Sequence, residues 1–350
     1  MAVERVLAGL EVSVVERRRV VDVGVLADYW ALTKPEINFL ILVTTFAGFY
    51  LGCVSESREL PFVSLVNALL GTMLVASGAG TLNQYIERRF DAQMRRTSRR
   101  PLAAGRLNPS AVLWFGVTLS AIGGIYLAVT VNWLASLLAV FTLLSYLFFY
   151  TPIKRKTPLC TFVGAIPGAV PPLIGWAAAS GKLPVEAWVL FGIIFFWQFP
   201  HFMAIAWMYR DDYERAGYMV LPRRRAGNFA ILQTLVPLSF LIPISLVPVI
   251  SGRLGPLYFI GASLLSITFF YYGVQFAIRR SIPAARRLLA ASILYLPLLF
   301  ALVTIPGSSS VHNGLWMTAC SRGITPPLRG GMAATSIKYR EASVVERTGW

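Results

Sequence analysis

Three polar side chains recur at intervals of four residues where a long apolar run ends. The stretch reads "NQYIERRFDAQMRRTSRRPL", residues 83–102, and the three side chains belong to Asn83, Glu87 and Asp91. A helix turns by about 100° per residue, so a step of four residues advances by about 40° and the three side chains share a sector of about 80°. The spacing therefore predicts a helix face on which three oxygen donors converge on one site.

A second acidic group follows another apolar run. The stretch "YRDDYERAGYMVLP", residues 209–222, brings Asp211 and Asp212 together with arginines. Oxygen ligands on two facing helices suit Mg²⁺, a hard cation that is usually held through a few carboxylates and the phosphates of a substrate. The two acidic groups together predict a magnesium site.

Basic residues accompany both acidic groups. Four arginines precede Pro101, where we expect the helix to end or bend: Arg95, Arg96, Arg99 and Arg100. In addition, "YTPIKRK" places Tyr150 and Lys154 four residues apart, so that both can reach one anion. Arginine binds phosphate oxygens through paired hydrogen bonds, and the whole set predicts a diphosphate site at a membrane surface. The alternative is that the arginines only anchor the chain at the headgroup level, but anchoring requires no acids on a shared face.

The composition indicates a membrane protein. The chain has 350 residues, of which 56% are hydrophobic and 14% charged, and its mean hydropathy is +0.63, more apolar than a soluble core requires. Crossing a hydrocarbon layer takes about 20 helical residues, whereas barrel strands are shorter and alternate in polarity. We predict an all-α polytopic bundle of nine transmembrane helices with a central cavity open to the cytoplasmic side. The expected spans are 37–54, 62–82, 111–131, 133–149, 161–179, 187–209, 229–250, 257–276 and 288–304.

The net charge of +16 reports topology. Most of the 32 lysines and arginines precede the first span or lie in alternate loops, whereas the opposite loops carry only Arg58, Lys182 and Arg253. The positive-inside rule then places the N-terminus in the cytoplasm and the C-terminus on the opposite side of a bacterial inner membrane. This distribution indicates a lipid bilayer as the partner of the basic residues, and no nucleic acid.

The expected organisation has three parts. Residues 1–27 form a flexible cytoplasmic segment without a signal-peptide pattern, residues 28–305 form the membrane domain, and residues 306–350 form a disordered tail. Small residues and prolines between Gly164 and Gly181 indicate close helix packing with a kink. The cysteines are too far apart in sequence to suggest a disulfide framework or a thiolate metal site: Cys53, Cys160 and Cys320.

The charged motifs resemble those of the UbiA-type intramembrane prenyltransferases, in the form found in the haem-farnesylating branch. The resemblance covers about residues 28–304 and includes "LTKPEINFL", the first motif with its following "RTSRRPL", the tyrosine-lysine pair and "WQFPHFMAIAWMYRDDYERAGYMVLP". Two positions depart from the general pattern. Glu87 stands where many members carry Asp, and Ala216 lies four residues beyond Asp212, so the second motif is not a full DxxxD. The "DDYxxAG" form is similar to that of the haem branch.

The resemblance implies an activity and roles for the site residues. It implies transfer of the farnesyl group of farnesyl diphosphate to the 2-vinyl group of haem B, with addition of water, to give haem O. It also implies Mg²⁺ as the cofactor and a haem A synthase as a downstream partner. The implied metal ligands are Asn83, Glu87, Asp91, Asp211 and Asp212, and the implied diphosphate-binding residues are Arg96, Arg100, Lys154 and Tyr150.

Other interpretations remain open at this stage. His201, an ionisable residue within a span, is a candidate haem ligand or propionate contact, or else makes an interhelical hydrogen bond, and Gln198 carries the same alternatives. Prenylation of another aromatic acceptor, such as a 4-hydroxybenzoate-type quinone precursor or a chlorophyll, is the main rival, and it predicts a fuller second motif. An anion transporter is the distant rival, and it calls for polar groups near the bilayer midplane.

Overall fold

The computed structural model describes residues 24–56, 58–221, 226–250 and 254–304. Within these residues every long regular element is helical, and residues 24–32 precede the labelled helices as a further helical stretch. The elements are α2 (Pro35–Ser55), α3 (Phe62–Asp91), α4 (Pro109–Thr130), α5 (Trp133–Leu144), the π-helical η1 (Ser145–Tyr150), α6 (Thr151–Ile153), α7 (Cys160–Ala169), α8 (Pro171–Ser180), α9 (Val185–Met208), α10 (Arg210–Arg215), α11 (Ala226–Ile250), α12 (Pro256–Arg279) and α13 (Ile282–Thr304).

The predicted all-helical membrane fold is confirmed. Nine helical stretches of the described chain are long and apolar enough to cross a membrane, and each overlaps one predicted span. Two of them are composite, because α5, η1 and α6 run on as one stretch and α7 and α8 as another. The predicted tail, 306–350, lies outside the described residues, as does most of the segment 1–27, whose last four residues are helical.

Local sequence explains where several helices begin and bend. The side chain of Asn108 accepts a hydrogen bond from the amide of Ser110 at the start of α4, and Asn132 caps α5 in the same way through Ala135. Side-chain caps of this kind satisfy amides that have no partner within the helix. The break between α7 and α8 falls at Val170, directly before two prolines, which confirms the predicted kink.

The prediction that the charged helix ends at Pro101 is wrong. Helix α3 passes the expected boundary at residue 82 and ends at Asp91, and residues 92–105 form turns. The hydroxyl of Thr97 donates to the carbonyl oxygen of Asp91 at 2.9 Å. This bond satisfies a terminal carbonyl that has no partner within the helix, and the helix ends ten residues before the proline.

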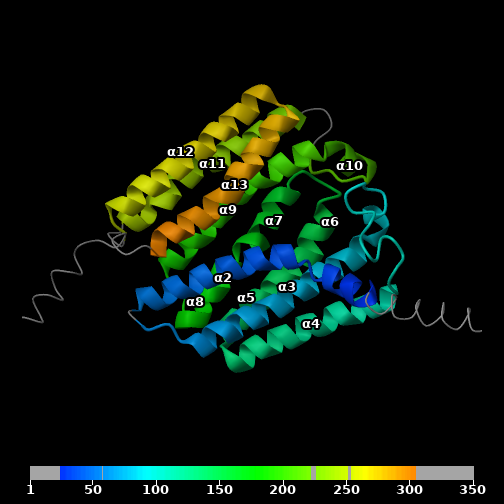
Figure 1. Ribbon diagram of the computed structural model, residues 1–350, viewed down its shortest axis with the longest axis horizontal. Helices are drawn as coiled ribbons and strands as arrows, with labels where there is room; N and C mark the ends of the chain where they lie inside the picture. Colours follow the sequence, from blue (N-terminus) through cyan, green and yellow to red (C-terminus); the bar gives the residue numbers. More distant parts are fainter. Residues whose placement is uncertain (1–23, 57, 222–225, 251–253, 305–350) are drawn as a thin grey trace, which may run out of the picture. The chain divides into compact units, whose positions relative to one another are not determined.

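The helices pack as two neighbouring groups (Figure 1). One group contains α2, α3, α4, α5 and α8, and the other contains α9, α11, α12 and α13, with α7 packed against α9. Small residues allow the closest approach, between α2 and α8, where a Cβ on Gly175 would lie 1.9 Å from the carbonyl oxygen of Thr45. The close packing expected for residues 164–181 is therefore confirmed.

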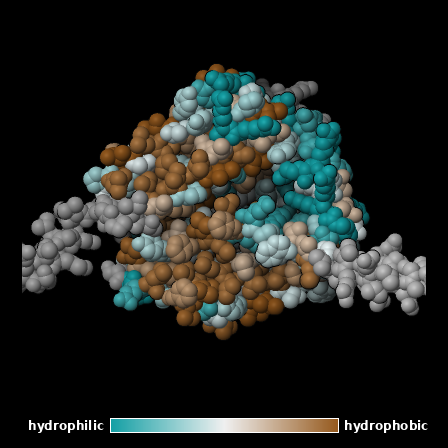
Figure 2. All heavy atoms as spheres, viewed as in Figure 1, coloured by the Kyte–Doolittle hydropathy of each residue, from teal (hydrophilic) through white to brown (hydrophobic). Residues whose placement is uncertain are grey.

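The surface separates into apolar and hydrophilic regions. Figure 2 shows hydrophobic residues over much of one face and hydrophilic residues gathered around α10 and the segment that follows α3. Large apolar side chains that are more than half exposed occur on α2, α4, α5 and α12, as on Phe39, Ile125, Leu137 and Leu264. Exposed apolar area of this extent is expected where lipid is the solvent.

The contact between α2 and α8 can be tested with one methyl group. Gly175→Ala should destabilise the protein by about 1–3 kcal/mol, because the new Cβ collides with backbone that cannot move without separating the two helices. Gly124→Ala is the matched control, since its Cβ would meet only a methyl of Val140, at 3.4 Å. Thermal unfolding in detergent should show a lower midpoint for Gly175→Ala alone, and equal midpoints for both variants would contradict this account.

Candidate active site

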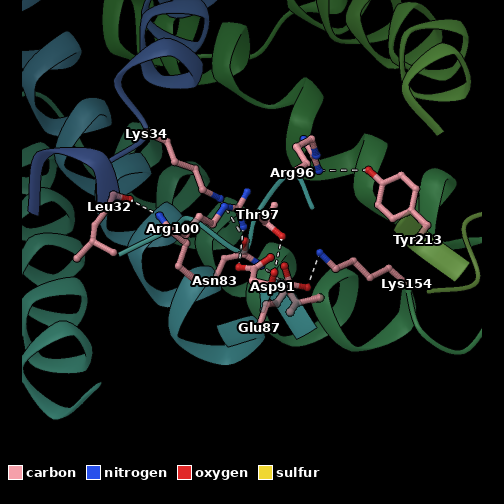
Figure 3. Close-up of polar contacts among 12 residues, drawn as sticks. Leu32, Lys34, Asn83, Glu87, Asp91, Arg96, Thr97, Arg100, Lys154 and Tyr213 are labelled. Atoms are coloured by element: carbon pink, nitrogen blue, oxygen red, sulfur yellow. Dashed lines mark hydrogen bonds and ion pairs between the residues drawn. The ribbon is translucent and has the colours of Figure 1, made fainter. Parts of the chain in front are cut away.

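The three residues of the first motif lie side by side on α3, as their spacing predicts (Figure 3). Asn83, Glu87 and Asp91 are all buried, with exposed fractions of 2%, 4% and 1%. Removing a carboxylate from water is costly unless a cation or hydrogen-bond donors replace the water. The buried carboxylates of Glu87 and Asp91 therefore need cations or hydrogen-bond donors close by.

Each of the three residues is met by a cation from a different part of the chain. The ammonium group of Lys154, just after α6, forms an ion pair with Glu87. Arg100 donates to one carboxylate oxygen of Asp91 at 2.7 Å. Lys34, directly before α2, donates to the amide oxygen of Asn83 at 3.2 Å. The motif is thus enclosed by positive charge from three segments that are distant in sequence (Figure 3).

Lys34 is a member of this site that the sequence reasoning assigned no role. Its backbone is left-handed, with φ 52° and ψ 62°, a conformation that is uncommon outside glycine and often marks functional sites. Burial, followed by the positive charges of Arg100 and Lys154, lowers the pKa of its ammonium group to about 7. The sequence around Lys34, "LTKP", does not indicate that this lysine joins the α3 motif, because its partner Asn83 lies 49 residues away.

The tyrosine-lysine pair lies against the same motif. Lys154 is 5.4 Å from the ring centroid of Tyr150 and 4.9 Å from that of Tyr218, so two aromatic faces support the cation. The amide group of Asn83 donates to the hydroxyl of Thr151 at 3.3 Å, which connects α3 to the start of α6. A Cβ on Gly164 would lie 2.5 Å from the Tyr150 ring, so α7 needs glycine there.

The second motif forms α10 and does not join the first cluster directly. The carboxylate of Asp211 is 86% exposed and lies 3.5 Å from Arg210, whereas Asp212 pairs with Arg215 one turn later. Both aspartates line a concavity of about 520 Å³, together with Arg95, Arg96, Met208, Tyr209 and Arg215.

Arg96 and Tyr213 connect the two motifs. The guanidinium group of Arg96 donates to the hydroxyl of Tyr213 at 3.5 Å and lies 5.3 Å from the ring centroid of Tyr209. Burial raises the pKa of the Tyr213 hydroxyl, so this group stays protonated at neutral pH. The diphosphate-binding residues expected from sequence therefore surround the first motif and reach the second through Arg96.

The donor set of α3 fits a divalent cation. One carboxylate oxygen of Asp91 is buried and accepts no hydrogen bond, whereas the other is held by Arg100. A buried oxygen without a partner is costly and is suited to a metal or a water. Among the residues that the structure describes, however, no three acidic, histidine or cysteine side chains come together in a metal-binding group. The aspartates of α10 would have to approach α3 to share one ion with it.

The two candidate haem-contacting residues make contacts between helices. His201 on α9 pairs through Nδ1 with the hydroxyl of Ser292 on α13 at 2.8 Å, and its ring stacks on Trp197 at 4.8 Å. Gln198 is buried and donates to the carbonyl oxygen of Ala165 on α7 at 3.1 Å. These contacts match the interhelical alternative, and the haem-related role of both residues stays a prediction.

Comparison with known proteins places these residues in a family. The model of the UbiA prenyltransferase family matches residues 41–296, which is more than half of the chain. The chain belongs to the UbiA prenyltransferase family. Among curated relatives, protoheme IX farnesyltransferase of Solibacter usitatus is 48% identical over 285 residues, which is 79% of this chain and 98% of the relative. The relative of the same name from Koribacter versatilis is 40% identical and covers 81% of this chain and 94% of its own length.

Solved structures of UbiA-type proteins share the fold. A structure described as digeranylgeranylglyceryl phosphate synthase superposes with a TM-score of 0.65 at 16% identity, over 79% of this chain and 96% of that chain. A UbiA homolog from Archaeoglobus fulgidus, bound to GPP and Mg²⁺, has a TM-score of 0.55 at 16% identity, over 79% of this chain and all of that one. The sequence-based assignment to this family of membrane prenyltransferases is confirmed.

The ion pair between Lys154 and Glu87 can be tested through stability. Lys154→Met should destabilise the protein by about 3–5 kcal/mol, because it leaves a buried carboxylate without its cation. Adding Glu87→Gln to this variant removes the uncompensated charge and should recover part of the loss, as measured by thermal unfolding in detergent. A double variant no more stable than Lys154→Met would show that the pair contributes through packing alone.

Proposed function

We propose that the protein transfers the farnesyl group of farnesyl diphosphate to the 2-vinyl group of haem B, with addition of water, and releases haem O and diphosphate. The observation that carries this proposal is the 48% identity to a protoheme IX farnesyltransferase over nearly all of that relative. The buried α3 face, with its carboxylates and three cations, supports it chemically. Haem O would then pass to a haem A synthase in the assembly of a terminal oxidase.

The cations of the site are suited to exchange partners when a diphosphate binds. In the structure Lys154, Arg100 and Lys34 are each held by an oxygen of α3. A magnesium ion on Asn83, Glu87 and Asp91 would satisfy those oxygens and supply positive charge against the departing diphosphate. The three cations, with Arg96 and the hydroxyl of Tyr150, would then donate to phosphate oxygens. Asp211 and Asp212 would hold metal from the side of α10.

Bond cleavage needs charge stabilisation and no protein nucleophile. The allylic C–O bond breaks with its electron pair on the diphosphate, and donors positioned around that group lower the barrier. The vinyl group of haem attacks the farnesyl cation, and water adds to the resulting cation and loses a proton. The apolar helices would sheath the isoprenoid in a central cavity and keep water from the first cation.

In this proposal haem, the acceptor of the farnesyl group, binds beside α9. The Nδ1 of His201 is engaged by Ser292, so Nε2 is the nitrogen that would face haem iron or a propionate. Gln198 lies one turn earlier on the same helix and would complete this side of the pocket.

The proposed setting is a bacterial inner membrane. The curated relatives named above are bacterial, and the nine apolar stretches support several crossings. The charge distribution of the loops supports a cytoplasmic N-terminus, a C-terminus on the opposite side, and a diphosphate site that opens to the cytoplasm.

The activity can be tested directly with the full chain in membranes. Haem B, farnesyl diphosphate and Mg²⁺ are supplied, and mass spectrometry follows the appearance of the farnesylated, hydrated haem. A preparation that prenylates 4-hydroxybenzoate and leaves haem unchanged would overturn the assignment in favour of the quinone-precursor rival. Withholding Mg²⁺ should stop product formation.

A carboxylate substitution tests the role of Asp91. Asp91→Asn should abolish haem O formation, because the amide no longer provides a charged ligand or a partner for Arg100. The matched control is Asp28→Asn, which neutralises an aspartate paired with Arg106 at 2.9 Å outside the site. The control should keep near wild-type turnover, and both variants should reach the membrane folded. Normal turnover in Asp91→Asn would refute its role.

Lys34, to which the sequence assigned no role, provides a second test of the site. Lys34→Gln should raise the KM for farnesyl diphosphate roughly tenfold or more, because a charge-assisted hydrogen bond to the diphosphate is lost. Lys156→Gln removes an equal charge from an exposed position after α6 and should leave the KM unchanged. Equal effects in both variants would indicate a diffuse electrostatic contribution instead.

A further inference from the structure

A small polar pocket lies between α12 and α13 and includes no residue of the α3 site. It has a volume of about 50 Å³ and is lined by Tyr271, Tyr272, Gln275, Arg279, Ala284 and Arg287. One water needs roughly 10–15 Å³ measured in this way. The pocket therefore has room for a group of the size of a phosphate and is too small for an isoprenoid chain or a haem.

The polar lining comes from two helices and consists largely of hydrogen-bond donors. Tyr271, Gln275 and Arg279 follow one another at intervals of four residues, so they lie along one face of α12. The amide of Gln275 donates to the hydroxyl of Tyr271 at 3.0 Å, which orients both groups. Arg287 contributes a second guanidinium group from α13. Two guanidinium groups facing one small pocket favour a phosphate, which accepts several charge-assisted hydrogen bonds.

The local charge is positive and has no carboxylate nearby in sequence to balance it. Four arginines lie where α12 meets α13, and hydrophilic residues gather there in Figure 2. No aspartate or glutamate occurs between Glu214 and Glu341, so α11, α12 and α13 contain no acid at all. This differs from the α3 site, where cations and carboxylates are paired within the protein. A counter-anion for this pocket is therefore expected from outside these helices.

An apolar surface leads away from the pocket along α12. Leu264, Ile267 and Tyr271 are 62%, 58% and 55% exposed, and their spacing of three and four residues places them on one side of the helix. A ligand that carries a phosphate at one end and hydrocarbon behind it would meet donors in the pocket and apolar side chains along the helix. A free phosphate ion would use only the first of these.

We propose that the pocket between α12 and α13 binds the phosphate group of an anionic phospholipid. Basic pockets between transmembrane helices on the cytoplasmic side recognise such headgroups, and each arginine near the surface contributes about a fivefold gain in affinity. The acyl chains lie along the exposed stripe of α12. This assignment is independent of the proposed prenyl transfer, because it uses no residue of that site.

The test compares adjacent arginines. The full chain is reconstituted in nanodiscs of phosphatidylcholine with a minority of phosphatidylglycerol, and native mass spectrometry measures how much phosphatidylglycerol is retained on release. Arg287→Gln should reduce retention roughly five- to tenfold. Arg286→Gln removes the same charge from the neighbouring residue, which does not line the pocket, and should leave retention near the wild-type level. Arg279→Gln is the second pocket variant and should act like Arg287→Gln from the other helix.

Three outcomes would overturn the proposal. Equal losses in Arg286→Gln and Arg287→Gln would indicate diffuse attraction without a pocket. Unchanged retention in both pocket variants, with each protein folded by circular dichroism, would exclude a role for the arginines. Displacement of phosphatidylglycerol by inorganic phosphate at equal concentration would identify a free-anion site in place of a lipid site.

Discussion

The structure depends on one electrostatic constraint, namely that two carboxylates and an amide are buried on a helix that otherwise crosses an apolar layer. Unpaired, Glu87 and Asp91 would each cost several kcal/mol in desolvation. The fold meets this requirement with three cations that come from before α2, from the turns after α3 and from the end of α6. The segments that carry these cations are therefore held in place by the polar groups of α3 that they neutralise or bind.

Several local irregularities follow from this constraint. The left-handed backbone at Lys34 lets a lysine reach inward directly before a proline-initiated helix. The early end of α3 at Asp91 allows Arg100 to return to the helix that it has just left. The π-helical η1 ends beside Thr151, which meets Asn83, and Lys154 follows within the same turn region. Irregular backbone near membrane depth is tolerated where protein groups satisfy it, and each of these segments lies against the polar motif.

The sequence predicts the helices well because their cause is local. A run of about 20 apolar residues is sufficient to identify a span, and the four-residue spacing of Asn83, Glu87 and Asp91 is sufficient to place them on one face. The partners of that face depend on tertiary approach. Nothing in the sequence around Lys34 connects it to Asn83, and nothing before Pro101 shows that the helix ends at Asp91 or that Thr97 bonds to its last carbonyl.

The charge balance of the α3 site supports the proposed binding of a magnesium diphosphate complex. Arg100 and Lys154 pair with the two carboxylates, and Lys34, whose pKa is lowered to about 7, adds a positive excess when its ammonium group is protonated. One oxygen of Asp91 remains without a hydrogen-bond donor. In the proposed reaction this oxygen would accept the cation, and the basic groups would accept the anion. A magnesium diphosphate complex supplies both charges together. Binding of this complex would replace the ion pairs within the protein with ion pairs to the ligand. The excess positive charge of the site would be neutralised only when the ligand is bound.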